Sequence, residues 1–151
     1  MSYICKSIGV FMSNKFKTEN DFDLVNEPDM GYYINYTHSG MAFSTFENQT
    51  HKVPFTQNEW STVLNLSERT FQRYKKENKK FESIYTEKIL EILILFKRGI
   101  EVFQNEANFY EWLNSSSLAL GNIKPLSIID NSFGIEAVKN ELGRIEHGII
   151  A

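Results

Sequence analysis

The clearest pattern of apolar positions in this chain lies near its end. Aliphatic residues recur there at steps of 3, 4, 3 and 4, namely Ile135, Val138, Leu142, Ile145 and Ile149. This spacing places them on one face of a helix. We predict a helix that Asp130 or Asn131 caps and that runs toward His147, with Ile145 packed inside the chain.

The last three residues, Ile149, Ile150 and Ala151, carry the apolar pattern to the chain end. Terminal residues are usually frayed and polar unless something holds them. An exposed apolar end is unfavourable for a lone protein in water. Either this end packs on its own domain or it binds a partner, and the pattern leaves both open.

A longer helix is predicted to begin at Ser83 or Thr86. Its apolar positions follow a helical spacing, at Ile89, Leu93, Phe96, Ile100 and Phe103. Ile92 and Leu95 widen this stripe, so the helix should be covered on more than one side. We expect it to be the spine that joins the two halves of the chain.

Three shorter elements are indicated more weakly. Residues 31–35 form a short extended or helical piece, and residues 40–50 form a helix diluted by serine and threonine. Asn105 or Asn108 caps a further short helix that contains Trp112. No segment alternates apolar and polar residues convincingly, so the predicted architecture is all-α.

Residues 56–77 have the pattern of two short helices joined by a tight turn. Thr56 and Glu59 have the spacing of a capping box, in which each side chain satisfies a backbone donor at the helix start. Ser67 is placed to cap the second helix after the connection Asn65-Leu66. Two helices joined in this way form a helix-turn-helix, whose second helix enters the DNA major groove.

The second of these helices has an apolar face and a basic face. Phe71 and Tyr74 are predicted to point inward. Arginine and glutamine side chains recognise base edges and lysines neutralise phosphates, so sequence-specific DNA binding by a dimer is the favoured interpretation. A solvated charged surface is the plain alternative. The candidate DNA contacts are Ser67, Arg69, Thr70, Gln72, Arg73, Lys75 and Lys76.

The charges are spread unevenly along the chain. The formal net charge of -3 would by itself argue against nucleic acid as a partner. However, residues 67–80 hold six cations against two acids, whereas residues 18–30 hold five acids and no cation. The distribution of charge matters more than its sum, so the basic middle keeps DNA binding open.

Length and composition restrict the class of protein. A chain of 151 residues suits one domain, or two small ones that share a core. Cys5 is the single cysteine, which excludes an internal disulfide and fits a reducing compartment. The longest apolar run, residues 89–96, contains Glu91 and is too short to cross a membrane. No signal peptide is recognisable, and we expect a cytoplasmic protein with no membrane association.

Residues suited to catalysis or metal binding are not grouped in the sequence. The histidines at positions 38, 51 and 147 lack metal-ligand spacing, both among themselves and with Cys5. Glu146 and His147 are adjacent, and neighbouring helix residues point about 100° apart, so they cannot easily act together. We therefore expect no enzyme activity, no catalytic residues, no metal and no cofactor.

Gly143 lies inside the predicted last helix, where glycine costs about 1 kcal/mol relative to alanine. Two explanations remain open at this stage. The glycine allows close packing of another helix of the same chain, or it allows close approach of a partner's backbone.

The C-terminal third carries the residues of a family resemblance. They are Trp112-Leu113, Ala119-Leu120-Gly121, Pro125, Asp130, Gly134, Val138 and the run from Gly143 to Gly148. This part of the chain resembles the toxin-binding domain of Xre/MbcA/ParS-type antitoxins. Residues 66–73 are similar to the Xre-like DNA-binding half of the same antitoxins, so the resemblance covers about residues 40–151. Ser116 and Asn122 depart from the family pattern, which often has a proline and a glycine at these places.

The resemblance implies an antitoxin of a type II toxin–antitoxin system. The usual partner is a RES-domain toxin that depletes NAD, and the antitoxin places its C-terminal segment at the active-site entrance of that toxin. The N-terminal half is expected to dimerise and to repress the shared operon, within a homodimer or a larger hetero-oligomer with the toxin. The implied toxin contacts are Arg144, Glu146, His147, Gly148, Ile149, Ile150 and Ala151.

Three parts of the chain are expected on this basis. Residues 1–30 form a variable arm, residues 31–95 the helix-turn-helix domain for DNA binding and dimerisation, and residues 96–151 the toxin-binding domain. Two alternatives to the antitoxin are kept. One is a stand-alone transcriptional regulator with a C-terminal dimerisation domain, and the other is an adaptor that has lost DNA binding.

Overall fold

The helices predicted from the sequence are present in a computed structural model of the chain, which describes residues 30–148. Within that range the elements occur in the order α1 (Met30–Ser39), β1 (Met41–Ala42), α2 (Phe43–Thr50), α3 (Gln57–Val63), α4 (Glu68–Glu77), β2 (Lys80–Phe81), α5 (Ser83–Phe103), α6 (Glu106–Asn114), the 3-10 turns η1 (Leu118–Leu120) and η2 (Pro125–Ser127), and α7 (Ser132–Glu146). The all-α prediction is therefore confirmed, with one two-residue ladder added to it.

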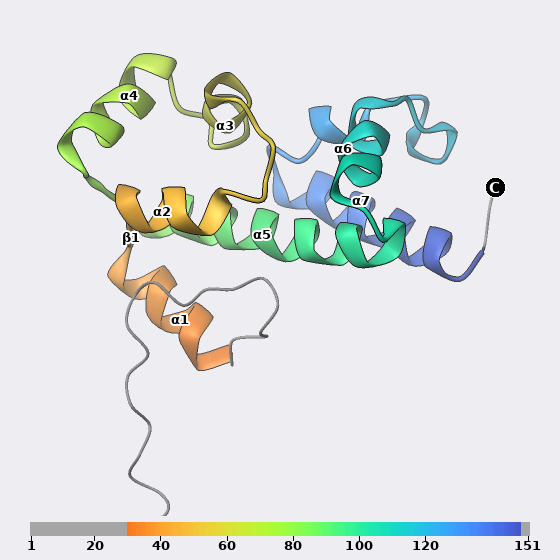
Figure 1. Cartoon of the computed structure of the whole chain (residues 1–151), viewed down its shortest axis with the longest axis horizontal. Coiled ribbons are helices and arrows are strands. Elements are labelled where there is room, and N and C mark those ends of the chain that lie inside the picture. The colour runs from red at the N-terminus through yellow and green to blue at the C-terminus, as the bar shows by residue number, and fades with distance from the viewer. Residues whose placement is uncertain (1–29, 149–151) are drawn as a thin grey trace, which may run out of the picture.

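Helix α5 is the spine of the molecule. It has 21 residues, and α1, α2, α6 and α7 all pack against it. In Figure 1 it runs beneath α2 at one end and reaches α6 and α7 at the other. Ile92, Leu93 and Leu95 are fully buried, as expected for a helix covered on several sides. The boundary predicted between residues 95 and 96 falls inside this helix.

Side-chain caps begin four of the helices. Thr56 and Glu59 form the predicted capping box of α3, and Ser67 caps α4 by accepting from the Thr70 N–H at 3.1 Å. Of the alternatives left open by the sequence, Asn105 caps α6 and Asn131 caps α7. These caps are correct predictions because each depends only on residues within one turn.

Helix α5 begins at Ser83 but has no side-chain cap. The Ser83 hydroxyl instead donates to the Thr37 carbonyl of α1 at 2.6 Å. The buried Thr86 hydroxyl accepts from the Met41 N–H at 3.1 Å and donates to the Phe81 carbonyl at 3.2 Å. Both hydroxyls therefore tie α5 to segments distant in sequence, which a local pattern cannot reveal.

The ladder pairs β1 with β2 in antiparallel register, with Met41 opposite Phe81 and Ala42 opposite Lys80. It joins the start of α2 to the segment between α4 and α5. Gly40 precedes it with a φ of +75°, and a Cβ at this residue would lie 2.6 Å from the Phe81 carbonyl oxygen. Only glycine tolerates both the left-handed backbone and this close approach.

Aromatic rings form two clusters within the core, beside its aliphatic residues. One cluster belongs to the N-terminal half and consists of Phe43, Phe46, Trp60, Phe71, Tyr74 and Phe81. A second cluster joins α5 to α6 and consists of Phe96, Phe103, Phe109 and Trp112. Phe55 connects the two, because its ring centroid lies 5.2 Å from that of Trp60 and 5.0 Å from that of Phe96.

Candidate functional surfaces

Helices α3 and α4 form the predicted helix-turn-helix. Asn65 in the turn has a φ of +53°, a left-handed conformation that asparagine tolerates better than most residues. Asn78, the C-cap that follows the last residue of α4, is also left-handed. Phe71 and Tyr74 are 4% and 3% exposed, so their burial fixes which face of α4 points outward.

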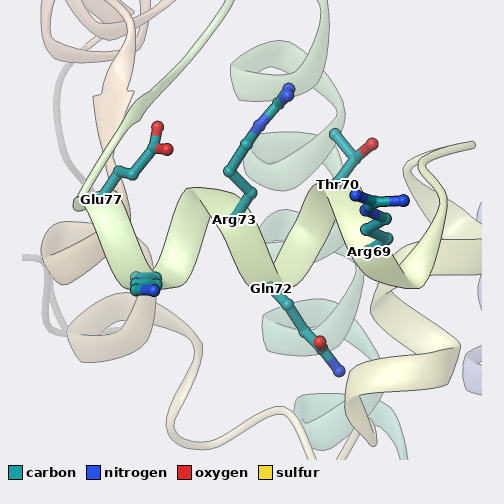
Figure 2. A pocket seen from close by; sticks show the side chains of 6 residues that line it. Arg69, Thr70, Gln72, Arg73 and Glu77 are labelled. Carbon is teal, nitrogen blue, oxygen red and sulfur yellow. The ribbon is translucent and has the colours of Figure 1, made fainter.

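The outward face of α4 carries four side chains that no hydrogen bond or ion pair holds within the described part of the chain: Arg69, Gln72, Arg73 and Lys76. All four are exposed. Figure 2 looks onto this face and shows Arg73 and Gln72 leaving the helix on different sides. Three cations and one amide are thus available to a ligand, without the loss of any internal bond.

The other three candidate DNA contacts, Ser67, Thr70 and Lys75, have hydrogen-bond or ion-pair partners within the chain. The Ser67 hydroxyl donates to Thr70 Oγ1 at 2.8 Å while it caps the helix. Lys75 Nζ lies 3.2 Å from Glu47 Oε1 of α2. Ser67 and Thr70 therefore stabilise the start of α4, whereas Lys75 is in an exposed ion pair that contributes only about 0–1 kcal/mol and can be exchanged.

A shallow hollow of about 410 Å³ lies on the same face and is lined by Arg69, Thr70, Gln72, Arg73, Lys76 and Glu77. All six of these residues belong to α4. Small-molecule sites are concave and are usually enclosed by several elements, with apolar walls. A hollow between charged side chains of one helix instead suits an extended anionic surface.

Helix α7 carries the candidate toxin contacts at its C-terminal end. Ile135, Val138 and Leu142 are buried as predicted, and Ile145 is half-buried. His147 and Gly148 are exposed, and Gly148 has a φ of +69°. Residues 149–151, which include three of the candidates, lie outside the described residues.

Two of the candidate toxin contacts have partners in their own chain. Glu146 forms an ion pair with Arg98 of α5, and Arg144 Nη1 lies 3.3 Å from Glu141 Oε2. The side chains of Arg98 and Glu146 are 43% and 38% exposed. Exposed ion pairs contribute about 0–1 kcal/mol, so Glu146 can exchange its partner at little cost.

Sequence reasoning missed a set of exposed apolar side chains in the C-terminal half: Leu118, Ile123 and Phe133. Leu118 is 83% exposed and Phe133 is 88% exposed. Leu118 begins the three-residue 3-10 turn η1 and Ile123 lies after it, and these segments are too short for a period that could reveal their orientation. Phe133 lies in the first turn of α7, outside the helix face that buries Ile135, Val138 and Leu142.

Other kinds of site find no support between residues 30 and 148. In that range, no three His, Cys, Asp or Glu side chains are grouped as metal ligands would be. Over the same residues, none of the helices combines the length and apolar character needed to cross a membrane. Tyr110 has a raised pKa, caused first by burial and then by its hydrogen bond to Glu59, but it lies in the link between the two halves.

Comparison with known proteins assigns both halves. The family model described as the antitoxin Xre-like helix-turn-helix domain matches residues 35–93. The model described as the antitoxin Xre/MbcA/ParS C-terminal toxin-binding domain matches residues 98–148. The antitoxin Xre of Photorhabdus laumondii is 25% identical over 101 residues, which cover 61% of this chain and 68% of that relative.

Proposed function

This chain belongs to the Xre/MbcA/ParS antitoxins, with a helix-turn-helix DNA-binding domain followed by a toxin-binding domain, and on that premise we propose its mode of action. It neutralises a RES-domain, NAD-depleting toxin by placing its C-terminal segment at the active site of that toxin. It also represses its own operon from the cytoplasm. Its family is one of antitoxins and not of enzymes.

The course of α7 is the observation that carries the toxin half of this proposal. The helix buries Ile135, Val138 and Leu142 against the domain and ends at Glu146. His147 and Gly148 follow it and are exposed, so the chain leaves the domain at the surface. Because the apolar residues Ile149 and Ile150 come next, a concave site of a partner would bury them favourably, by about 1.5–3 kcal/mol each.

The exposed face of α4 supports the DNA half. The side chains that we propose to contact the operator are Arg69, Gln72, Arg73 and Lys76. Ser67 and Thr70 stabilise the start of the helix, and Lys75 can exchange Glu47 for a phosphate at little cost. A single helix-turn-helix binds weakly, and operators are read by two-fold dimers. We therefore propose that the chain acts as a homodimer, or as a larger hetero-oligomer with the toxin.

The proposal is tested by removing residues 148–151 in cells that express the toxin of the same operon. The shortened chain should keep its thermal unfolding and its operator affinity, because the buried residues of α7 that the structure describes all precede residue 148, but it should no longer restore growth. The chain with Ile149→Ser and Ile150→Ser, at full length, separates loss of apolar burial from loss of length.

If the shortened chain restores growth as well as the full chain does, the placement of the tail in the toxin is contradicted. Cellular NAD is measured in the same cultures to identify the toxin class. NAD should fall when the toxin is expressed alone and recover with the full chain. Toxicity with constant NAD would show that the partner is not a RES-domain toxin, while leaving the antitoxin function intact.

A further inference from the structure

Two apolar side chains of the toxin-binding domain point into solvent from one short loop, residues 117–123. Leu118 is 83% exposed and Ile123 is 45% exposed. Leu120 lies between them in sequence but packs against the core, so the loop is anchored on one side and apolar on the other. Contiguous exposed apolar surface marks interaction sites in soluble proteins.

The conformation of the 117–123 loop is fixed by its own backbone. The Ser117 N–H donates to the Ile123 carbonyl at 3.0 Å, and the Asn122 N–H donates to the Ser117 carbonyl at 2.8 Å. Gly121 and Asn122 adopt left-handed conformations, with φ of +76° and +63°. Leu118 is therefore held outward by a closed turn, and a preformed surface loses little conformational freedom on binding.

The loop lies against the helix that carries the C-terminal segment. η1 packs on α7, and Figure 1 shows the loop after α6 on the side of the molecule where α7 ends. Phe133 is equally exposed but belongs to the first turn of α7, and that helix is about 22 Å long at 1.5 Å per residue. The two exposed apolar groups are thus separated along α7.

Gly143 is an independent feature of the C-terminal end of α7. An added Cβ at Gly99 would meet the Phe109 ring at 2.3 Å, and one at Gly134 would meet the Ile128 carbonyl oxygen at 1.6 Å. At Gly143 it would meet no atom of residues 30–148 within 4 Å. Close packing inside the chain therefore explains the first two helical glycines but not Gly143, although glycine is unfavourable in a helix. The remaining explanation from the sequence is the approach of a partner's backbone.

We propose that the 117–123 loop and the last turns of α7 form a docking surface for the body of the toxin, distinct from the tail that enters its active site. The toxin is the occupant because Leu118, Ile123 and Gly143 all lie in residues 98–148, the match to the toxin-binding domain. The surface is also continuous with the helix that delivers the tail. The inference rests on the proposed function for the identity of this partner.

The chemistry of the surface defines what the toxin must present. Leu118 requires an apolar recess, and Gly143 accepts a backbone segment beside it. This surface supplies affinity, while the tail supplies inhibition. The two roles can be separated, because the loop is held in place by hydrogen bonds that do not involve residues after 148.

The test measures the Kd of the purified full-length chain for the toxin of its operon, made inactive by substitution, by titration calorimetry. Leu118→Ser with Ile123→Ser should raise the Kd about 10-fold to 100-fold, the loss expected when a large apolar side chain is no longer buried. Phe133→Ser is the matched control, as it removes an equally exposed apolar side chain at the other end of α7. It should leave the Kd unchanged.

Two further outcomes complete the test. The chain shortened after His147 should still bind the inactive toxin, while it fails to restore growth with the active one. An unchanged Kd for the loop variant, or an equal rise for the Phe133 variant, overturns the docking surface. If the unaltered chain does not bind the toxin at all, the proposed function fails, and this inference fails with it.

Discussion

The Tyr110 hydroxyl donates a hydrogen bond to Glu59 Oε1 at 2.9 Å, and this contact joins α6 of the toxin-binding domain to α3 of the helix-turn-helix. The other oxygen of the same carboxylate accepts from the Thr56 N–H at 2.7 Å as part of the capping box. Glu59 therefore serves both the start of a DNA-binding element and its attachment to the second half.

A second link lies nearby. Asn65, in the turn between α3 and α4, donates through Nδ2 to the Asp130 carbonyl at 3.3 Å, next to the cap of α7. With Phe55 between the two aromatic clusters, these contacts make the halves pack as one unit. The orientation of α4 relative to α7 is consequently set by packing and not by a flexible linker.

Replacing Tyr110 by phenylalanine should lower the free energy of unfolding by about 0.5–1.5 kcal/mol, the usual net contribution of one hydrogen bond. The measurement is urea unfolding at pH 8. Tyr85→Phe is the control, because that residue is also half-buried and its hydroxyl donates to no carboxylate within residues 30–148. An equal effect of the two substitutions would contradict a specific role for the link.

The Tyr110–Glu59 pair also predicts that the free energy of unfolding depends on pH in the alkaline range. Burial, and then the hydrogen bond and charge of Glu59, raise the pKa of Tyr110 above its usual 10.0. The folded protein therefore holds this proton more tightly than the unfolded chain, and the stabilisation is complete below pH 10 and lost as pH rises through the higher pKa. The stability difference between the unaltered chain and Tyr110→Phe should accordingly shrink above about pH 10.

Alanine substitutions at two helical glycines should have opposite effects on stability. Gly99→Ala places a Cβ 2.3 Å from the ring of the fully buried Phe109 and should destabilise the fold by about 1–3 kcal/mol. Gly143→Ala places a Cβ that meets no atom of the described residues within 4 Å, and it should stabilise the fold by about 1 kcal/mol through helix propensity. Calorimetry of both variants tests this, with an expected change in Tm of about 2–4 °C per kcal/mol.

The stabilising variant should nevertheless be a poorer antitoxin. If a backbone of the toxin approaches Gly143, the added methyl group keeps it at a distance, so Gly143→Ala should bind the inactive toxin more weakly while it unfolds at a higher temperature. Asn48→Ala is the control, because it also improves an exposed helical position but lies on α2 in the other half. If the unaltered chain, Gly143→Ala and Asn48→Ala all bind the toxin with equal affinity, Gly143 does not serve the approach of the toxin's backbone.

Removing two cations from the outward face of α4 should weaken operator binding and reduce its dependence on salt. With Arg73→Ala and Lys76→Ala, the slope of log K against log salt should fall by about 1.8, if each cation neutralises one phosphate. Fluorescence anisotropy with the DNA upstream of the operon gives this slope. Lys124→Ala with Lys139→Ala changes the net charge equally in the other half and serves as the control.

An unaltered slope for the α4 variant would favour the adaptor that has lost DNA binding. A slope that falls equally for the control would show that only the net charge of the chain matters. Gln72→Ala provides the complementary test, because loss of a base contact should reduce discrimination between operator and unrelated DNA by about 1–3 kcal/mol without changing the slope.

The helix-turn-helix caps and the buried faces of α4, α5 and α7 could be predicted from neighbours along the chain. Thr56, Ser67 and Asn131 act as caps because a cap needs only a backbone N–H within the next turn. Phe71 and Tyr74 are buried because residues three apart share one face of a helix. These features depend on neighbours in the chain, so the local pattern is sufficient to predict them.

Which exposed groups are available, and how the halves are joined, depends on packing between distant segments. Lys75 is paired with a residue of α2, whereas Lys76 on the same helix has no such partner among the described residues. Tyr110 and Glu59 are 51 positions apart, and the packing that leaves Leu118 outward involves α7. Such contacts depend on how helices pack around α5, and no periodicity along the chain encodes the distance between side chains on different helices.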